Sequence, residues 1–344
     1  MSHDRSPEHD SPTESQHVPG WYPIAASSSV VQRKPLGVMR FGQSLVLWRV
    51  AAGRVVAFPD RCSHRAAALS PGKIRAGCLE CPYHGLRFNA DGKCVLIPAN
   101  GVGAAVPAGF DLSLISVREE HGIVWQWRGE GEPSREVPWI PGASEPGVGA
   151  AEYTYTLNVP YLRIAENLLD FHHFPILHKA MLPGIGTRMD EMEVTADSGI
   201  LSFSATMRYE TPSRLRRDRA IKAKFTLPAI ALIDFGGFYV NYFLTPVDET
   251  HTWLYARYRS TTNDGWLGGM MGKIAARYDR AIFVLQDRQV LLSQTDAPGD
   301  FSRFKLYPAD RAFAIFWGMR KHAILDARKG NAEQQSDVGS VAAR

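Results

Sequence analysis

Cysteine is scarce in this chain of 344 residues, which contains only four. Four thiols are too few for a disulfide scaffold, so the fold must depend on a hydrophobic core or on bound metal. The chain also has no apolar run as long as a membrane span, and its N-terminus lacks the apolar stretch of a signal peptide. We therefore expect a cytoplasmic protein without a membrane partner, in which cysteines stay reduced or bind metal.

An excess of charge of one sign is also missing. The chain has 39 basic and 35 acidic side chains, which gives a net charge of +4. This balance does not indicate a nucleic acid or a membrane surface as a partner. Hydrophobic residues make up 45% and charged residues 22%, as in ordinary globular proteins, and the length leaves room for two domains.

Composition predicts two domains, a linker and two disordered tails. The first tail, residues 1–18, is built mainly from Ser, His, Asp, Glu and Pro, which bury too little apolar surface to become ordered. Short β-prone runs predict an all-β domain over residues 19–128. A stretch rich in Gly, Pro and Glu, residues 129–149, is the expected linker. The second domain is expected over residues 150–328, and a second tail over 329–344.

The second domain is predicted to be an antiparallel sheet with flanking helices, which makes the whole chain α+β. The patterns predict strands over residues 153–157, 192–208, 222–234, 236–245 and 252–260, and helices near residues 164–177 and 278–294.

Two short motifs in the first domain predict a metal site. Cys62-Ser-His64 and Cys81-Pro-Tyr-His84 are separated by sixteen residues. A zinc finger pairs like ligands, whereas each segment here holds one Cys and one His. This order favours a [2Fe–2S] cluster of the Rieske type, in which one iron takes both thiolates and the other takes both imidazoles. Cys78 and Cys81 also form a Cys-x-x-Cys pair, but Cys81 is better explained as a ligand.

A second candidate site lies in the thirteen residues from Glu166 to His178, which hold three histidines and two carboxylates among apolar neighbours. Such polar groups are costly to bury unless a partner such as a metal ion compensates. Asp170 and His173 are three residues apart and share one helical face. Pro175 is expected to kink the helix and to bring His178 to the same side as His173.

These motifs together resemble the Rieske non-haem iron oxygenases, specifically their catalytic α subunits, over about residues 20–328. In that family a helix carries Asn-x-x-Asp-x-x-His-x-x-x-x-His, which here falls on Asn167, Asp170, His173 and His178. The resemblance implies an N-terminal all-β Rieske domain and a helix-grip-like catalytic domain. It also implies that both histidines bind a mononuclear Fe(II), with Asn167 beside them and O₂ as co-substrate. His172 does not fit the ligand spacing and is expected to pack or to line a pocket.

The third iron ligand lies downstream, and composition leaves Asp279, Asp287 and Asp296 as candidates. Family members place this ligand in a segment similar to Glu/Gln-Asp-x-x-Val-Leu-x-x-Gln. The run Gln286-Asp-Arg-Gln-Val-Leu-Leu-Ser-Gln294 matches it, so the resemblance selects Asp287. Many relatives have an acid where this chain has Leu292.

The resemblance further implies a homotrimer in which the cluster of one subunit lies beside the iron of the next. Asp170 would bridge His84 of a neighbouring subunit to His173, because an ionised carboxylate can accept hydrogen bonds from two imidazoles. A separate NAD(P)H-dependent reductase, a ferredoxin, or both would supply electrons. The chain is most similar to the branch of vanillate and dicamba demethylases, which implies monooxygenation of a small aromatic or cyclic substrate by O- or N-demethylation.

Other functions fit the same residues. A ring hydroxylase or dioxygenase, or a desaturase, would use the same scaffold, a Rieske electron carrier would lack the second iron, and a zinc-binding module would be colourless. Residues expected to line the substrate pocket are Asn241, Tyr242 and Phe283, with Leu227, Ile230, Phe238 and Val240 as further candidates. The basic run at residues 214–224 is either a solvated face or a site for an acidic substrate or the reductase.

Overall fold

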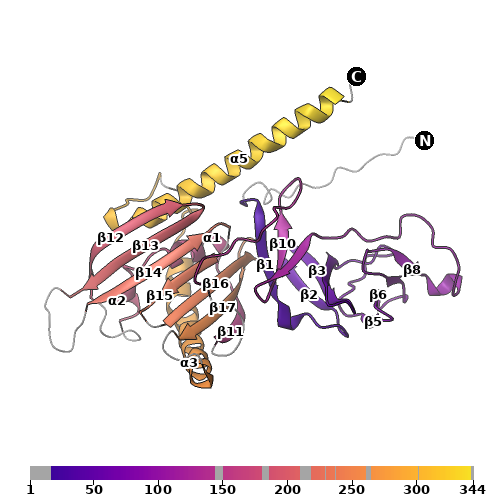
Figure 1. Cartoon of the computed structure of the whole chain (residues 1–344), viewed down its shortest axis with the longest axis horizontal. Coiled ribbons are helices and arrows are strands. Elements are labelled where there is room, and N and C mark those ends of the chain that lie inside the picture. The colour runs from indigo at the N-terminus through magenta and orange to yellow at the C-terminus, as the bar shows by residue number, and fades with distance from the viewer. Residues whose placement is uncertain are drawn as a thin grey trace.

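The structure is a computed structural model of the chain that describes residues 17–143, 150–179, 186–209, 218–228, 230–236, 238–260, 265–300 and 302–341, without the side chains of 283, 284 and 330–341. Most of the predicted N-terminal tail lies outside these residues. Val18, at its end, is buried. The predicted fold class is confirmed, because small β-sheets precede a large antiparallel sheet with helices (Figure 1).

The N-terminal domain consists of three small antiparallel sheets, with strand orders β1-β10-β9, β2-β3-β4 and β5-β6-β7-β8. The strands are β1 (Gly20–Ala26), β2 (Leu36–Arg40), β3 (Gln43–Arg49), β4 (Val55–Pro59), β5 (Lys73–Arg75), β6 (Cys78–Glu80), β7 (Arg87–Phe88), β8 (Cys94–Leu96), β9 (Val117–Glu120) and β10 (Ile123–Arg128). Strands β3 and β4 are apolar on both faces and separate two clusters of buried side chains. The sheet β5–β8 forms the end of the molecule farthest from the large sheet (Figure 1).

The second domain is built on one seven-stranded antiparallel sheet of order β11-β17-β16-β15-β14-β13-β12. Its strands are β11 (Ala150–Leu157), β12 (Arg188–Asp197), β13 (Ile200–Arg208), β14 (Arg219–Thr226), β15 (Ile230–Asp234), β16 (Phe238–Pro246) and β17 (Thr252–Ser260). The runs predicted at 192–208 and 222–234 are each two strands rather than one. The first is divided by a turn at Ser198 and Gly199, which both adopt positive φ.

Five helices accompany this sheet. They are α1 (Tyr161–Leu168), α2 (Phe174–Leu177), α3 (Trp266–Ile282), α4 (Arg288–Ser293) and α5 (Arg311–Val341), with a π-helical turn, η4 (Phe283–Asp287), between α3 and α4. The chain also has 3₁₀ turns, η2 (Ser27–Ser29), η3 (Pro98–Asn100) and η5 (Pro308–Asp310). Helix α5 continues through residues 329–341, which differs from the disordered tail that their composition predicted.

The single helix predicted near residues 164–177 is wrong, because the chain leaves the helix after Leu168 and re-enters it at Phe174. Pro175 does not cause this break. It lies in the first turn of α2, where a missing N–H removes no helical hydrogen bond. The short helix α2 instead has His173 as its N-cap residue and His178 as its C-cap residue.

The two faces of the large sheet have different partners, because successive side chains of a strand point to opposite faces. Tyr242, Leu254 and Tyr258 belong to the cluster that includes side chains of helices α1, α3 and α5. Phe243 and Tyr255 belong to a separate cluster with side chains of the N-terminal domain, including Trp21 and Trp125 of β1 and β10. The sheet therefore packs against the helices with one face and against the N-terminal domain with the other.

Arg257 of β17 adds polar contacts between the sheet and the N-terminal domain. Its side chain is fully buried and donates to the Glu152 carboxylate at 2.9 Å, to the Tyr255 hydroxyl at 2.8 Å and to the carbonyl oxygen of His121 at 2.9 Å. A buried guanidinium is stable only with such partners. The contact with His121, in the turn before β10, fixes the N-terminal domain against the sheet.

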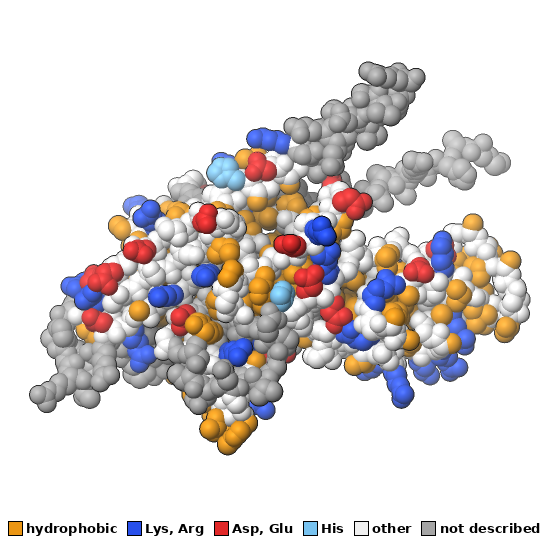
Figure 2. Space-filling view, viewed as in Figure 1, with side chains coloured by type: hydrophobic (Ala, Val, Ile, Leu, Met, Phe, Trp, Pro, Cys, Tyr) orange, Lys and Arg blue, Asp and Glu red, His pale blue; other side chains and the backbone are white. Residues whose placement is uncertain are grey.

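The outer surface carries charges of both signs, and Figure 2 shows acidic and basic side chains interspersed on the visible face. This distribution agrees with the small net charge of +4. Among the residues that the structure describes, none of the helices is both long enough and apolar enough to cross a membrane.

Gly72 packs where the chain turns into β5. A Cβ atom at this position would lie 2.2 Å from the carbonyl oxygen of Glu80. We predict that Gly72→Ala lowers the free energy of unfolding of the N-terminal domain by about 3 kcal/mol, because backbone atoms must move. Nearby, Gly77 has φ +76° and open space around it, so Gly77→Ala should cost only about 1 kcal/mol. Urea unfolding of both variants measures the difference, and equal losses would contradict the packing argument.

Candidate metal centres

Two loops of similar geometry hold the predicted cluster ligands. One follows β4 and carries Cys62, and the other follows β6 and carries Cys81. The backbone N–H of Cys62 donates to the carbonyl oxygen of Ala67 at 2.8 Å, and that of Cys81 donates to Leu86 at 2.8 Å. Each loop is therefore closed by a hydrogen bond between its cysteine and the residue five positions later, so the two cysteines have the same backbone environment.

Both loops also have a residue with left-handed backbone conformation at the equivalent position. Ala66 and Gly85 each lie four residues after the cysteine, with φ values of 58° and 71°, and each donates to the carbonyl oxygen of that cysteine. The equivalent position is therefore occupied by Gly in one loop and by Ala in the other, and the turn geometry is retained in both.

The four ligand side chains divide into a buried pair and an exposed pair. Cys62 and Cys81 are each 2% exposed, whereas His64 and His84 are exposed and their rings are 4.7 Å apart. Burial raises the pKa of the Cys62 thiol to about 11, so a metal is needed to hold it as a thiolate. All four cysteines are free, so Cys78 and Cys81 form no disulfide. The donor set fits a [2Fe–2S] cluster, which the two buried thiols and the two exposed imidazoles would hold.

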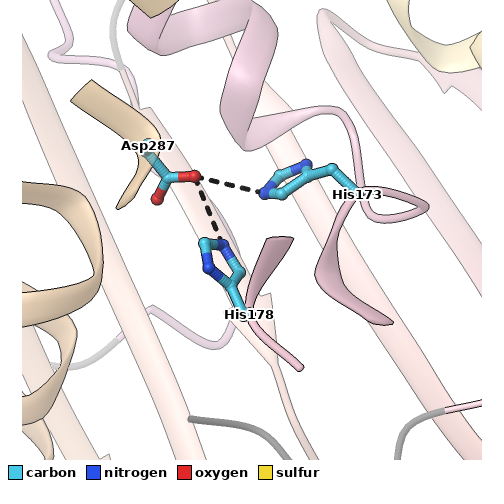
Figure 3. Close-up of side chains that lie close together, drawn as sticks. All are labelled: His173, His178 and Asp287. Carbon is cyan, nitrogen blue, oxygen red and sulfur yellow. Dashed lines mark ion pairs between the residues drawn. The ribbon is translucent and has the colours of Figure 1, made fainter. Parts of the chain in front are cut away.

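The second domain brings together His173, His178 and Asp287 (Figure 3). The two histidines flank α2, and Asp287 ends the π-helical turn η4. Nε2 of His178 is 3.3 Å and Nε2 of His173 is 3.5 Å from Oδ1 of Asp287. A π-helical turn is rare and often marks a functional site. Here it replaces the regular helix that the sequence predicted over residues 278–294.

Asp287 and His178 are buried and His173 is half-buried, and the three side chains have too few partners of their own. Asp287 is 2% exposed and His178 is 1% exposed. Neither ring nitrogen of His173 forms a hydrogen bond with any described residue. A buried carboxylate and an unpaired buried imidazole are both costly. Two imidazoles and one carboxylate on one side of a metal, with open positions opposite, form the donor set of non-haem Fe(II) sites. The residues therefore fit a mononuclear iron.

Neighbouring amides orient the ligands. Nδ1 of His178 lies 2.7 Å from Oε1 of Gln286 and donates to it, which leaves Nε2 free to face Asp287. Asn167 Nδ2 donates to Oδ1 of Asp287 at 3.4 Å. Asn167 was predicted from the sequence as a neighbour of the ligands. The role of Gln286 was not predicted, although it directly precedes the ligand in the matched segment.

Asp170 lies behind His173, on the side away from Asp287. Its Oδ2 is 3.4 Å from Nδ1 of His173, and its Oδ1 is 3.2 Å from Nδ1 of His172. Burial alone would raise the pKa of the Asp170 carboxyl, but its interactions with His173 and His172 lower it, so the carboxylate stays ionised. Asp170 is 36% exposed and lines a cleft of about 470 Å³ together with His172 and Tyr307.

The other two aspartates that the sequence allowed as ligands have other partners. Asp296 forms an ion pair with Arg303 at 2.6 Å. Asp279 accepts hydrogen bonds from the hydroxyls of Tyr242 and Tyr258. Only Asp287 is grouped with both histidines among the described residues.

The predicted pocket residues do not share one location. Tyr242 lies on the helix-facing side of β16, whereas Asn241 is fully buried and points to the opposite face. The Phe283 side chain is outside the described part of the chain, as are residues 214–217 of the basic run. The described basic residues of that run are Arg219, Lys222 and Lys224 of β14, and the two lysines alternate with buried Ile221 and Ala223.

A Cys–His loop pair in one domain and a two-histidine, one-carboxylate centre in the other define a class of protein that joins an electron-transfer cluster to a mononuclear iron. Comparison with known families agrees with this class. Residues 20–108 match the Rieske [2Fe-2S] domain, and residues 157–312 match the vanillate O-demethylase oxygenase C-terminal domain. The chain therefore belongs to the Rieske non-haem iron oxygenases and has the domain order of their catalytic subunits.

Individual relatives match only in part. Protein TIC 55 of Arabidopsis thaliana is 34% identical over 160 residues, which cover 46% of this chain and 30% of that protein. The oxygenase component of dicamba O-demethylase from Stenotrophomonas maltophilia is 32% identical over 198 residues, 57% of each chain. The matched segments thus span between about a third and just over half of these relatives.

A solved structure of dicamba monooxygenase bound to dicamba covers 90% of this chain and 98% of its own, with a TM-score of 0.70 and 24% identity. At this identity the likeness establishes the fold. The family implies a [2Fe–2S] cluster and a mononuclear iron, and the donor sets described above fit both groups.

The triad formed by His173, His178 and Asp287 predicts how many iron atoms each chain binds. We expect three irons per wild-type chain, and we expect Asp287→Ala to retain two together with the red-brown colour of the cluster, because only the mononuclear site loses a ligand. Asp296→Ala, which changes the rejected candidate ligand, should keep three. Iron analysis and visible absorption measure both. Three irons in Asp287→Ala, or two in Asp296→Ala, would show that the ligand is wrongly assigned.

The two cysteine-bearing loops predict opposite outcomes for two cysteine substitutions. Cys81→Ala should lose the cluster absorption, because one thiolate ligand is removed. Cys78→Ala, three residues away on β6, should keep it. The visible spectra of the two purified variants provide the measurement. A colourless Cys78→Ala protein would mean that the Cys-x-x-Cys pair, and not the two loops, holds the metal.

Proposed function

We propose that this chain is the oxygenase component of a multicomponent system that uses O₂ and electrons from NAD(P)H to monooxygenate a small aromatic or cyclic substrate by demethylation. The observation that carries the proposal is the presence, in one chain, of the Cys62/Cys81 loops and the His173–His178–Asp287 triad. A pure electron carrier has no use for the second centre. The similarity to dicamba O-demethylase supports removal of a methyl group.

Cys62, Cys81, His64 and His84 would hold the cluster, and His173, His178 and Asp287 would hold the iron; when bound, these groups would supply single electrons and the activation of O₂, and the protein supplies their position. His173, His178 and Asp287 are the two-histidine, one-carboxylate set that would hold an iron and leave it open positions for O₂. Hydroxylation of a methyl ether or N-methyl group gives an unstable hemiacetal or carbinolamine, which releases formaldehyde. Each turnover consumes one O₂ and two electrons with two protons, and yields demethylated product, formaldehyde and water.

The proposed assembly is a homotrimer in which electrons cross between subunits. The sheet β5–β8, which carries Cys81 just beyond β6, lies at the opposite end of the chain from α2 (Figure 1). Transfer inside one subunit would have to cross most of the molecule. The exposed His84 of one subunit and the cleft at Asp170 of the next offer a shorter path. Asp170 would accept hydrogen bonds from both His84 of the neighbour and His173.

The separate electron donor remains part of the proposal. The chain has no dinucleotide-binding motif that we identify, so a reductase, a ferredoxin, or both would reduce the cluster. The exposed imidazoles of His64 and His84 provide the point of electron entry and exit.

The mass of the product tests the proposed reaction. Purified protein is supplied with a surrogate reductase, NADH, O₂ and a panel of aryl methyl ethers, N-methyl compounds and aromatic acids. Loss of a methylene unit together with formaldehyde is the predicted result. Gain of one or two oxygens without formaldehyde would show a hydroxylase, and the demethylase proposal would be wrong.

Asp170→Asn tests the proposed bridge. We expect the variant to keep three irons per chain and a reducible cluster, while formaldehyde formation falls by about 100-fold, because Asn replaces one of the two carboxylate oxygens by an NH₂ group, which donates and cannot accept from the second imidazole N–H. Asp197→Asn, which changes an exposed aspartate of β12, is the matched control and should keep full activity. Metal content, chemical reduction and turnover are measured on the same preparations. Normal coupled turnover in Asp170→Asn would rule out the bridge.

A further inference from the structure

Helix α3 packs on the large sheet with small residues. Gly268, Gly272 and Ala276 are spaced four residues apart and are buried where the helix lies on β11 and β17. A Cβ atom on Gly272 would lie 3.0 Å from the Cβ atom of Ala151 in β11, so the helix backbone comes close to the sheet. Over most of its length α3 therefore contacts the sheet without large apolar side chains.

The large apolar side chains of α3 are on its outer side instead. Trp266, Met270 and Ile274 recur every four residues, so they share one face of the helix. Trp266 is 74% exposed and Ile274 is 63% exposed. Further exposed side chains widen this face: Leu267, Met271 and Tyr278. We call these residues together the apolar face of α3. Figure 2 shows hydrophobic side chains at the lower tip of the molecule, where α3 projects in Figure 1.

A row of cations borders the apolar face. Lys273, Arg277 and Arg280 are all exposed, and their spacing of four and then three residues places them in one row along the helix. The acidic residue of α3, Asp279, accepts hydrogen bonds from tyrosines of the sheet and therefore points the other way. All residues from Trp266 to Ile282 are described, and their exposed surface is apolar and cationic without an anion of its own.

A surface pocket of about 590 Å³ lies beside this row. Arg277 and Arg280 line it together with Tyr153 of β11, and the rest of its lining is apolar, from Ala276, Ala281 and Leu285. Guanidinium groups beside apolar side chains suit a ligand that is anionic at one end and apolar at the other. An anionic phospholipid has this composition.

We propose that the apolar face of α3 and its row of cations dock this protein on the surface of a bilayer that contains anionic lipids. Helices that lie in the plane of a membrane surface combine these two features, because apolar side chains enter the acyl boundary while Lys and Arg stay at the headgroups. Trp266 and Tyr278 are residue types that favour the interfacial region. The helix would lie on the bilayer without crossing it.

This proposal goes beyond the proposed function and departs from the expectation of no membrane partner. That expectation was based on the balance of charge over the whole chain, in which basic and acidic residues nearly cancel. The excess of cations on α3 is confined to one side of one helix, so whole-chain composition does not reveal it.

A second copy of the chain fits the apolar face less well than a bilayer. Two copies of α3 placed face to face would bring their rows of cations together, and like charges repel. The subunit contact proposed above uses the cluster loops and the cleft at Asp170, and none of the described residues that line this cleft belongs to α3. That assembly leaves the apolar face of α3 available.

Vesicle flotation of the holoenzyme tests the proposal. Vesicles of phosphatidylcholine alone are compared with vesicles of phosphatidylcholine and phosphatidylglycerol in equal amounts. We expect about 10- to 100-fold tighter binding to the mixed vesicles, because each cation near an anionic membrane strengthens binding about fivefold. Added salt should reduce this difference. Equal binding to both kinds of vesicle, or binding to neither, would overturn the proposal.

Variants connect vesicle binding to α3. Ile274→Asp puts a charge in the apolar face and should lower the affinity for mixed vesicles by about 10-fold or more. Lys273→Gln combined with Arg277→Gln should reduce the preference for mixed vesicles by about 10-fold or more. Val102→Asp changes a side chain of the N-terminal domain that is 97% exposed, and this matched control should bind like the wild type. Unchanged binding by Ile274→Asp would overturn the proposal.

The assembled mass in solution, measured by light scattering, identifies a second copy as the occupant of the apolar face. Under the proposal, wild type and Ile274→Asp have the same assembled mass and the same cluster absorption. A smaller assembly for Ile274→Asp would show that the apolar face is a contact between subunits, and would overturn the proposal. None of these measurements uses turnover, so their outcome is independent of the proposed reaction.

Discussion

The second domain places one carboxylate and two imidazoles where a single metal ion would attract all three. One ligand atom each of Asp287, His173 and His178 lies within 4.8 Å of the other two, where a buried carboxylate and the ring of His173, which has no hydrogen bond to a described residue, are costly. A divalent cation bound there would offset that cost and would hold α2 against η4. Gln286 and Asn167 then fix the direction of the ligands. The break between α1 and α2 and the π-helical turn both place ligands where regular helices would not.

The large sheet connects this centre to the rest of the molecule. One face carries the helices, the triad and the tyrosines around Asp279, and the other packs on the N-terminal domain through Trp21, Trp125 and Phe243. Arg257 crosses this boundary and is fully paired. This apolar packing and the hydrogen bonds of Arg257 together hold the N-terminal domain against the sheet.

Local sequence patterns could predict the fold class, the two motifs and the family, because the spacing of Cys, His and Asp reflects coordination chemistry directly. They could not predict the break before α2 or the π-helical turn, because tertiary packing and the ligand set override helical periodicity there. Alternation along β16 separates Asn241 from Tyr242, and only the assembled sheet shows which face each one takes. Asp279 carries no motif, and its hydrogen bonds from Tyr242 and Tyr258 depend on how α3 packs on the sheet.

The most direct test of the account is whether the second centre holds Fe(II) with open coordination positions beside an intact cluster. The reduced, anaerobic wild-type protein is treated with nitric oxide, which occupies the positions that O₂ would use, and is examined by electron paramagnetic resonance. The account predicts two signals of equal spin count per chain, one from the reduced Rieske cluster and one from an iron–nitrosyl species. A cluster signal alone, from protein with only two irons per chain, would contradict the account and show an electron carrier.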